Sequence, residues 1–219
     1  MPTFVCIILN TTLMFNLLKR LLNFGKPKEV ITPTVILSPT KEEIEESLKQ
    51  FLNRPQYKIL TTDIIDSIKD DDLVQAIFDS LSLNIEGNYE NELEWVGGLN
   101  PYKKAIYLIW GLESEVNNGG FNQYYYNSTG QFCDDAPPAL MLVGAAKFAN
   151  LVTEANQIIK ANFQDISKTW DGSIEGFTQS YINNPLDELD TKFFNLYEEE
   201  NLAKLQIAFI KANKEQFVS

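Results

Sequence analysis

The chain has 219 residues, an apolar fraction of 44% and a net charge of −12. Length and apolar fraction predict a folded domain with a core, and they argue against a disordered chain. The chain contains no histidine, which excludes Ser-His-Asp and Cys-His catalysis within it.

The first 39 residues read as a leader ahead of a helical domain at residues 40–219. An uncharged run precedes Lys19, but it is short and rich in Asn and Thr for a transmembrane helix. A secretory signal would carry its positive charge before the apolar run rather than after it. Met14 offers a second translation start.

Residues 14–24 of this leader match a short amphipathic helix. Such a helix would contact a membrane surface weakly. The alternatives are a helix packed on its own domain or a disordered leader. Prolines at positions 27, 33 and 39 then predict a linker.

From residue 40 onward the pattern is helical. Thr40 and Glu43 match a capping box, with apolar residues at helical spacing behind them. Three aspartates at residues 70–72 place negative charge at a helix start, where the macrodipole favours it. The buried stripe predicted for this helix consists of Leu73, Ala76, Ile77 and Leu81. The polar segment 85–100 carries three glycines and predicts a loop.

A long helix is predicted from Pro101, with Asn100 as its cap and an apolar face that runs to Val116. Two aspartates and two prolines at residues 134–138 indicate another helix start. Gly144 then marks a bend or a close contact.

Helical periodicity continues at residues 148–163, 185–196 and 201–217. No stretch alternates convincingly at period two, and no parallel-sheet unit is recognisable. The sequence therefore predicts an all-α, compact multi-helix domain of about seven to nine helices.

The most distinctive segment is the corner at residues 117–127, where two asparagines and two glycines precede a run of aromatic residues. Glycine is the usual residue in the left-handed position after a helix end. One interpretation is therefore a structural helix–turn–helix corner with an aromatic anchor. The other is a pocket in which Asn118, Asn122 and Gln123 orient a small ligand or peptide.

This corner carries an Asn-Gly-Gly-Phe-x-Gln-Tyr motif, and the next helix carries an Ala-Leu-x-x-x-Gly-Ala pattern. The residues are Asn118, Gly119, Gly120, Phe121, Gln123 and Tyr124, then Ala139, Leu140, Gly144 and Ala145. Over about residues 70–217 the chain resembles a bacterial family of domains of unknown function that includes a DNA-mimic protein. The resemblance implies an all-helical fold whose surface acids imitate phosphates and bind a transcription regulator.

Negative charge is unevenly distributed along the chain, because residues 1–40 carry +3 and the remainder carries −15. A body this acidic repels nucleic acid and attracts basic surfaces. The candidate partner-binding acids are Asp134, Asp135, Asp187, Glu188, Asp190, Glu198, Glu199 and Glu200. The alternative for these acids is a solvated helix surface together with charges at helix starts.

The leading hypothesis is a non-enzymatic acidic protein that binds a basic DNA-binding regulator. We expect the protein itself to bind no nucleic acid. A homodimer is one option for its oligomeric state. No catalytic residue, cofactor or metal site is predicted, and two isolated cysteines favour a reducing cytoplasm. The alternative is a small-ligand or peptide binder that uses residues 117–127. An enzyme ranks third, since Glu113 and Glu115 lie two apart on a helix and share no face.

Overall fold

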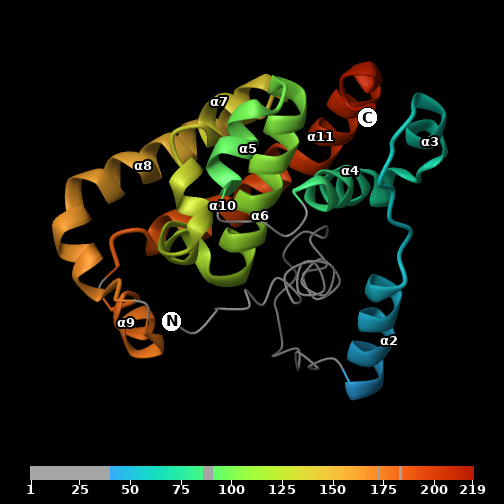
Figure 1. Ribbon diagram of the computed structural model, residues 1–219. Coiled ribbons are helices and arrows are strands. Elements are labelled where there is room, and N and C mark those ends of the chain that lie inside the picture. Colours follow the sequence, from blue (N-terminus) through green and yellow to red (C-terminus); the bar gives the residue numbers. More distant parts are fainter. Residues whose placement is uncertain (1–39, 86–90, 172, 183) are drawn as a thin grey trace, which may run out of the picture. The chain divides into compact units, whose positions relative to one another are not determined.

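The computed structural model describes residues 40–85, 91–171, 173–182 and 184–219 (Figure 1). These residues form ten α-helices and three short 3-10 helices, with no strand among them. The all-α prediction is confirmed, with slightly more helices than expected. None of the described helices has the length and hydropathy needed to cross a membrane. The leader, including its predicted helix at residues 14–24, lies outside the described residues.

Tertiary contacts divide the chain into two compact units, residues 1–55 and residues 56–219. In the first unit, helix α2 (Lys41–Leu52) begins at the predicted capping box. The Glu43 N–H donates to Thr40 Oγ1 at 3.2 Å, and the Thr40 N–H donates to the Glu43 carboxylate at 2.8 Å. No residue of α2 is buried. The predicted boundary between residues 39 and 40 stays a prediction.

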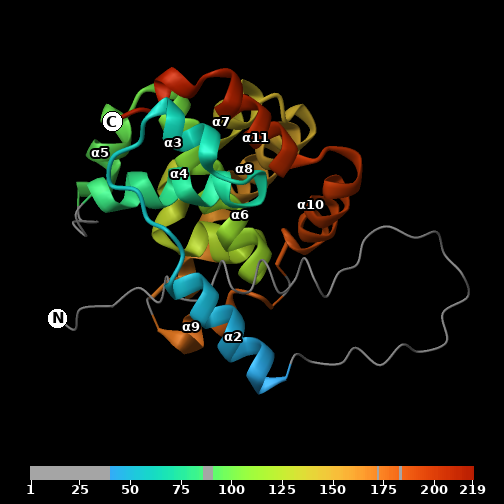
Figure 2. The same ribbon diagram turned by 90° about the vertical axis from the view of Figure 1, so that its right-hand side faces the viewer.

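The second unit holds the other described helices, and α6 packs against three of them, α4, α7 and α10. Helix α8 lies against α7 and α10, and α11 packs against α4 (Figure 2). The α-helices are α3 (Thr62–Ser67), α4 (Asp70–Asn84), α5 (Glu92–Gly98), α6 (Pro101–Tyr126), α7 (Ala136–Leu142), α8 (Ala146–Ile166), α9 (Ile174–Gln179), α10 (Asp187–Glu199) and α11 (Leu202–Ala212). The 3-10 helices are η3 (Ser128–Phe132), η4 (Ser167–Thr169) and η5 (Lys214–Gln216).

The core of this unit forms around α6. Ile106, Ile109 and Leu112 are completely buried, and the predicted stripe on α4, which includes Leu73 and Ile77, is buried as well. Burying one apolar side chain of this size contributes about 1.5–3 kcal/mol. The apolar face read from the sequence is therefore the face that holds α6 in place.

The C-terminus closes the second unit onto its beginning. The Ser219 N–H donates to the Leu60 carbonyl at 3.1 Å. Lys214 forms an ion pair with Asp66 at 2.7 Å, and Lys211 pairs with Asp70 at the start of α4. Residues far apart in the sequence thus tie the two ends of the unit together.

The prediction of a loop at residues 85–100 is wrong for the second half of this segment, which forms α5. Val96 is buried in the core, and the buried Glu92 accepts a hydrogen bond from the Tyr107 hydroxyl at 2.7 Å. These tertiary contacts stabilise a short helix in spite of its two terminal glycines. Seven residues are too few to display the helical period in the sequence.

Candidate functional site

Helix α6 kinks inside the Asn-Gly-Gly-Phe corner. Gly119 (φ −154°, ψ 29°) and Gly120 (φ 71°, ψ −176°) leave helical geometry, and helical geometry resumes at Phe121. The conformation of Gly120 is essentially restricted to glycine. The corner is therefore a kink between two helical stretches, with no longer turn between them.

Two side chains from outside α6 hold this kink. The Phe121 N–H donates to Asp190 Oδ1 at 2.7 Å, so α10 supplies a cap for the second stretch of α6. The Tyr181 hydroxyl donates to the Gly119 carbonyl at 2.8 Å. Burial raises the pKa of Asp190 to about 6; the Phe121 N–H opposes this rise, and the charge of Asp187 adds to it.

The amide side chains of the corner donate within the protein. Gln123 donates to the Glu115 carboxylate at 2.7 Å and accepts from Asn118 at 2.9 Å. Asn127 also donates to Glu115, at 2.8 Å. Burial raises the pKa of Glu115, and these amide donors oppose the rise. The network ties the corner together, as the structural interpretation requires.

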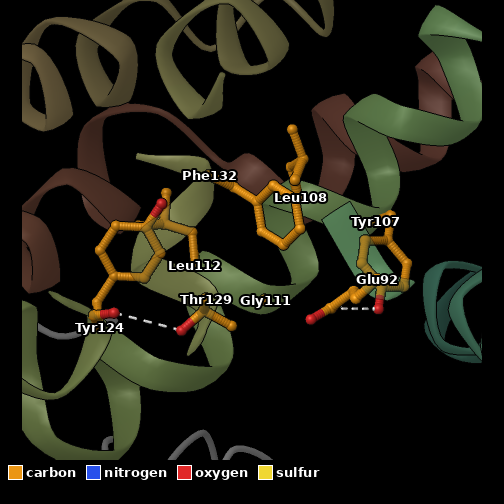
Figure 3. A pocket seen from close by; sticks show the side chains of 8 residues that line it. All are labelled: Glu92, Tyr107, Leu108, Gly111, Leu112, Tyr124, Thr129 and Phe132. Atoms are coloured by element: carbon orange, nitrogen blue, oxygen red, sulfur yellow. Dashed lines mark hydrogen bonds between the residues drawn. The ribbon is translucent and has the colours of Figure 1, made fainter. Parts of the chain in front are cut away.

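The aromatic residues of the corner form an anchor in the core. Phe121 and Tyr124 are completely or almost completely buried. The pocket beside Tyr124 and Thr129 has a cavity volume of about 10 Å³ (Figure 3). This volume holds about one water molecule. The small-ligand alternative for residues 117–127 gains no support from this pocket.

The family model for the DMP19-like protein matches residues 97–213, a span that includes the kink and α10. The chain belongs to the DMP19-like family. Neither the curated proteins nor the solved structures contain a match to this chain. The DMP19-like region begins shortly before α6 and ends after α11, so it contains every acid predicted to bind a partner.

Three of these acids in the DMP19-like region are paired with lysines. The pairs are Asp134 with Lys160 at 2.5 Å, Asp135 with Lys104 at 3.1 Å, and Glu199 with Lys147 at 2.7 Å. Each pair joins two different segments of the fold at its surface. The lysines neutralise these carboxylates locally, so the three sites present less negative charge than the sequence indicates.

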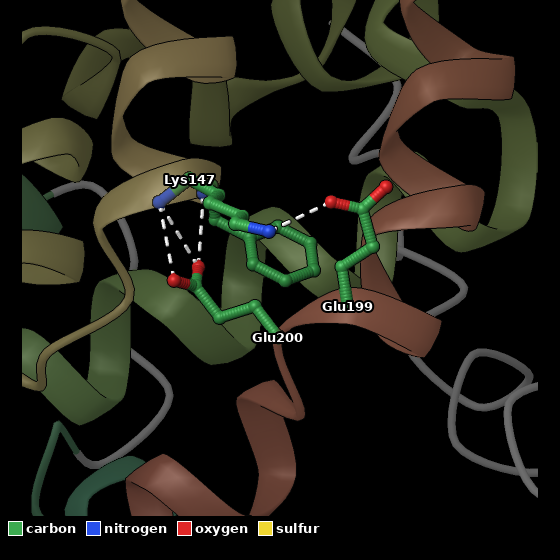
Figure 4. Close-up of polar contacts among 4 residues, drawn as sticks. Lys147, Glu199 and Glu200 are labelled. Carbon is green, nitrogen blue, oxygen red and sulfur yellow. Dashed lines mark hydrogen bonds and ion pairs between the residues drawn. The ribbon is translucent and has the colours of Figure 1, made fainter.

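Glu200 has a capping role (Figure 4). Its carboxylate accepts the N–H groups of Lys147 and Phe148, both at 3.1 Å. Helix α8 has Ala145 at its N-cap position and no cap bond from that side chain. Glu200 therefore replaces the missing cap, at a helix end where negative charge is favourable.

The other three acids, Asp187, Glu188 and Glu198, are exposed on α10. Within the described part of the chain, no lysine or arginine forms an ion pair with them. Asp187 and Glu198 are three helical turns apart, so they share one face at a separation of about 16 Å. Lys192 lies between them in the sequence, but it pairs with Glu154 at 3.0 Å.

Two further exposed acids, Asp171 and Glu175, also have no lysine or arginine partner among the described residues. Neither of them was singled out from the sequence. Among the described residues, no group of three acids or cysteines is arranged to hold a metal ion. The site is therefore a set of surface carboxylates on and before α10.

Proposed function

We propose that this DMP19-like chain is a non-enzymatic DNA mimic, whose carboxylates occupy the basic DNA-binding surface of a partner protein such as a transcription regulator. The observation that carries the proposal is the outer face of α10. There, Asp187, Glu188 and Glu198 are exposed and have no ion-pair partner within the described residues.

A mimic needs carboxylates on a rigid support, and α10 provides that support because contacts hold both of its ends. Asp190 joins its first turn to the kink of α6, and Glu200 joins its C-terminal end to α8. Both contacts lie on the protein side of α10, while the unpaired acids lie in solvent. Because both ends are held, the outer carboxylates need little ordering when a partner binds.

The charge of the chain supports the same proposal. The −15 carried by residues 41–219 repels DNA, while it attracts the lysines and arginines that a regulator uses for phosphates. A basic partner would therefore associate quickly at low ionic strength. Regulators of this kind work in the cytoplasm, where we place the complex.

The experiment is capture of partners from a cell lysate on the immobilised protein, at low salt, at high salt, and with excess duplex DNA. We expect both high salt and DNA to release the partner, because salt screens the charge pairs and DNA competes for the same surface. A partner that stays bound under both conditions contradicts the proposal. Direct binding of labelled DNA to the protein would contradict it as well.

A further inference from the structure

A line of aromatic side chains leads from α8 through α9 to the segment before α10. The ring centroids lie 5.8 Å apart for Phe163 and Trp170, and 6.0 Å for Trp170 and Tyr126. The line continues from Tyr126 to Phe177 at 4.9 Å and from Phe177 to Tyr181 at 5.2 Å. These contacts connect η4 and α9 to the C-terminal end of α6.

Three large apolar side chains beside this line are exposed: Phe163 by 52%, Ile174 by 87% and Ile182 by 60%. Phe163 is the first ring of the line, and Ile182 follows the last. Ile174 lies three residues before Phe177 on α9, so the two side chains share a helix face. We call Phe163, Ile174 and Ile182 the α9 patch. An exposed apolar surface with a polar rim is typical of an interaction site.

Acidic side chains border the α9 patch. Asp171 and Glu175 flank Ile174 in the sequence, and both are exposed. Burial raises the pKa of Tyr181, the last ring of the line, and the charges of Asp190, Glu115 and Asp187 raise it further. The neighbouring Lys168 is paired with Asp165 at 2.5 Å. The border of the patch is therefore negative.

We propose that the α9 patch docks a basic amphipathic helix of the partner, whose apolar side chains cover Ile174 while its lysines or arginines meet the acidic border. Charge complementarity selects this occupant, since an apolar centre with an acidic border matches an apolar helix face flanked by basic residues. Helix α9 buries only Gly176 in the protein itself, and Ile174 is left available to a partner. This inference rests on the proposed function in one respect, because the basic character of the partner is taken from it.

The probe is a synthetic helical peptide of leucine and lysine with one apolar face, titrated into the full chain at physiological ionic strength. A peptide of the same charge without leucine is the second probe. We expect the leucine-containing peptide to bind more tightly, and Ile174→Ser to weaken its binding by about tenfold. Glu175→Gln should weaken the binding of both peptides. Circular dichroism of each variant checks the fold.

Helix α5 provides a matched control, because Leu93 is 58% exposed and is followed by the exposed Glu94. Leu93→Ser and Glu94→Gln should leave peptide binding unchanged. Equal losses for the α5 and α9 variants, or equal binding of the two peptides, would overturn the inference. Self-association that Ile174→Ser abolishes would instead assign the patch to a second copy, and would also overturn it.

The outcomes separate the two proposals. If DNA releases the lysate partner while Ile174→Ser leaves peptide binding intact, the docking inference fails and the DNA mimic stands. If DNA and salt fail to release the partner while Ile174→Ser weakens peptide binding, the mimic fails and the docking of a basic helix stands.

Discussion

Gly120 and Asp190 are in direct contact, and together they determine the geometry of the kink. Gly120 has a positive φ, and a Cβ at that position would overlap the Asp190 carboxylate. Asp190 in turn accepts the Phe121 N–H. At the residue scale, the kink therefore depends on the absence of a side chain at one position and the presence of an acceptor at another.

Gly120→Ala should lower the free energy of unfolding by about 1–3 kcal/mol, because alanine strains the backbone there and clashes with Asp190. Thermal unfolding should show a melting temperature several degrees lower. Gly97→Ala is the control, since its new methyl group would meet nothing within 4 Å. Equal melting temperatures for the two variants would show that the kink carries no such constraint.

Asp190 should make stability depend on pH. Its pKa rises from 3.8 to about 6, so the folded protein binds the proton more tightly than the unfolded chain. Its contribution to stability is therefore complete below about pH 4 and is lost as the pH rises through about 6. Asp190→Asn keeps an acceptor for Phe121 and does not ionise, so we expect urea denaturation to show a flatter pH dependence in this window.

At neutral pH, Asp190→Asn should be at least as stable as the parent chain, because the cost of the half-buried charge is gone. Asp190→Ala loses the acceptor and should be less stable than Asp190→Asn by about 1 kcal/mol. A pH dependence that Asp190→Asn leaves unchanged would assign the titration to another group.

At the element scale, α10 both connects helices and presents charge. Asp190 of α10 caps the second stretch of α6, and Glu200, the residue after α10, caps the start of α8. The exposed Asp187, Glu188 and Glu198 have no ion-pair partner among the described residues. Acids that are neighbours in the sequence can therefore have different roles, depending on which way their side chains face. Glu199 forms an exposed ion pair with Lys147, whereas Glu200 accepts two backbone N–H groups.

Glu200→Ala should therefore cost about 1 kcal/mol of unfolding free energy, because α8 loses its cap. Glu199→Ala should cost about 0–0.5 kcal/mol, as is usual for exposed ion pairs. Glu200→Gln retains an acceptor and should fall between them. Chemical denaturation of the three variants measures this order, and an effect of Glu199→Ala as large as that of Glu200→Ala would contradict it.

At the scale of the whole molecule, residues 56–219 form a compact unit whose ends are joined through Leu60 and Ser219. A chain that begins at Gln56 should keep its helical circular dichroism and unfold cooperatively. The removed helix α2 buries no residue, so its loss exposes little apolar surface. A collapse of the helical signal would show that the first unit contributes to the core.

Local patterns predicted much of this fold. The apolar stripes of α4 and α6, the cap at Asn100 and the need for glycine at the corner all follow from residues close in sequence. The corner itself is a kink within α6 rather than the predicted turn after a helix end. Helix α5 could not be predicted, because contacts between distant segments stabilise it.

The candidate site was predicted less completely, for the same physical reason. An acidic residue in a sequence gives no sign of whether a lysine more than twenty positions away neutralises it, as Lys160 does for Asp134. Nor does the sequence show that Asp190 and Glu200 turn toward helix ends. Only the fold separates these acids from Asp187, Glu188 and Glu198.

The most direct measurement compares two triple variants with the same change in net charge. One is Asp187→Asn, Glu188→Gln and Glu198→Gln, and the other neutralises the lysine-paired acids Asp134, Asp135 and Glu199. Surface plasmon resonance would measure how each binds the partner captured from lysate. We expect the α10 variant to associate at least about tenfold more slowly, while the other variant stays near the parent rate. Equal rates for the two variants would show that net charge, rather than the outer face of α10, recruits the partner.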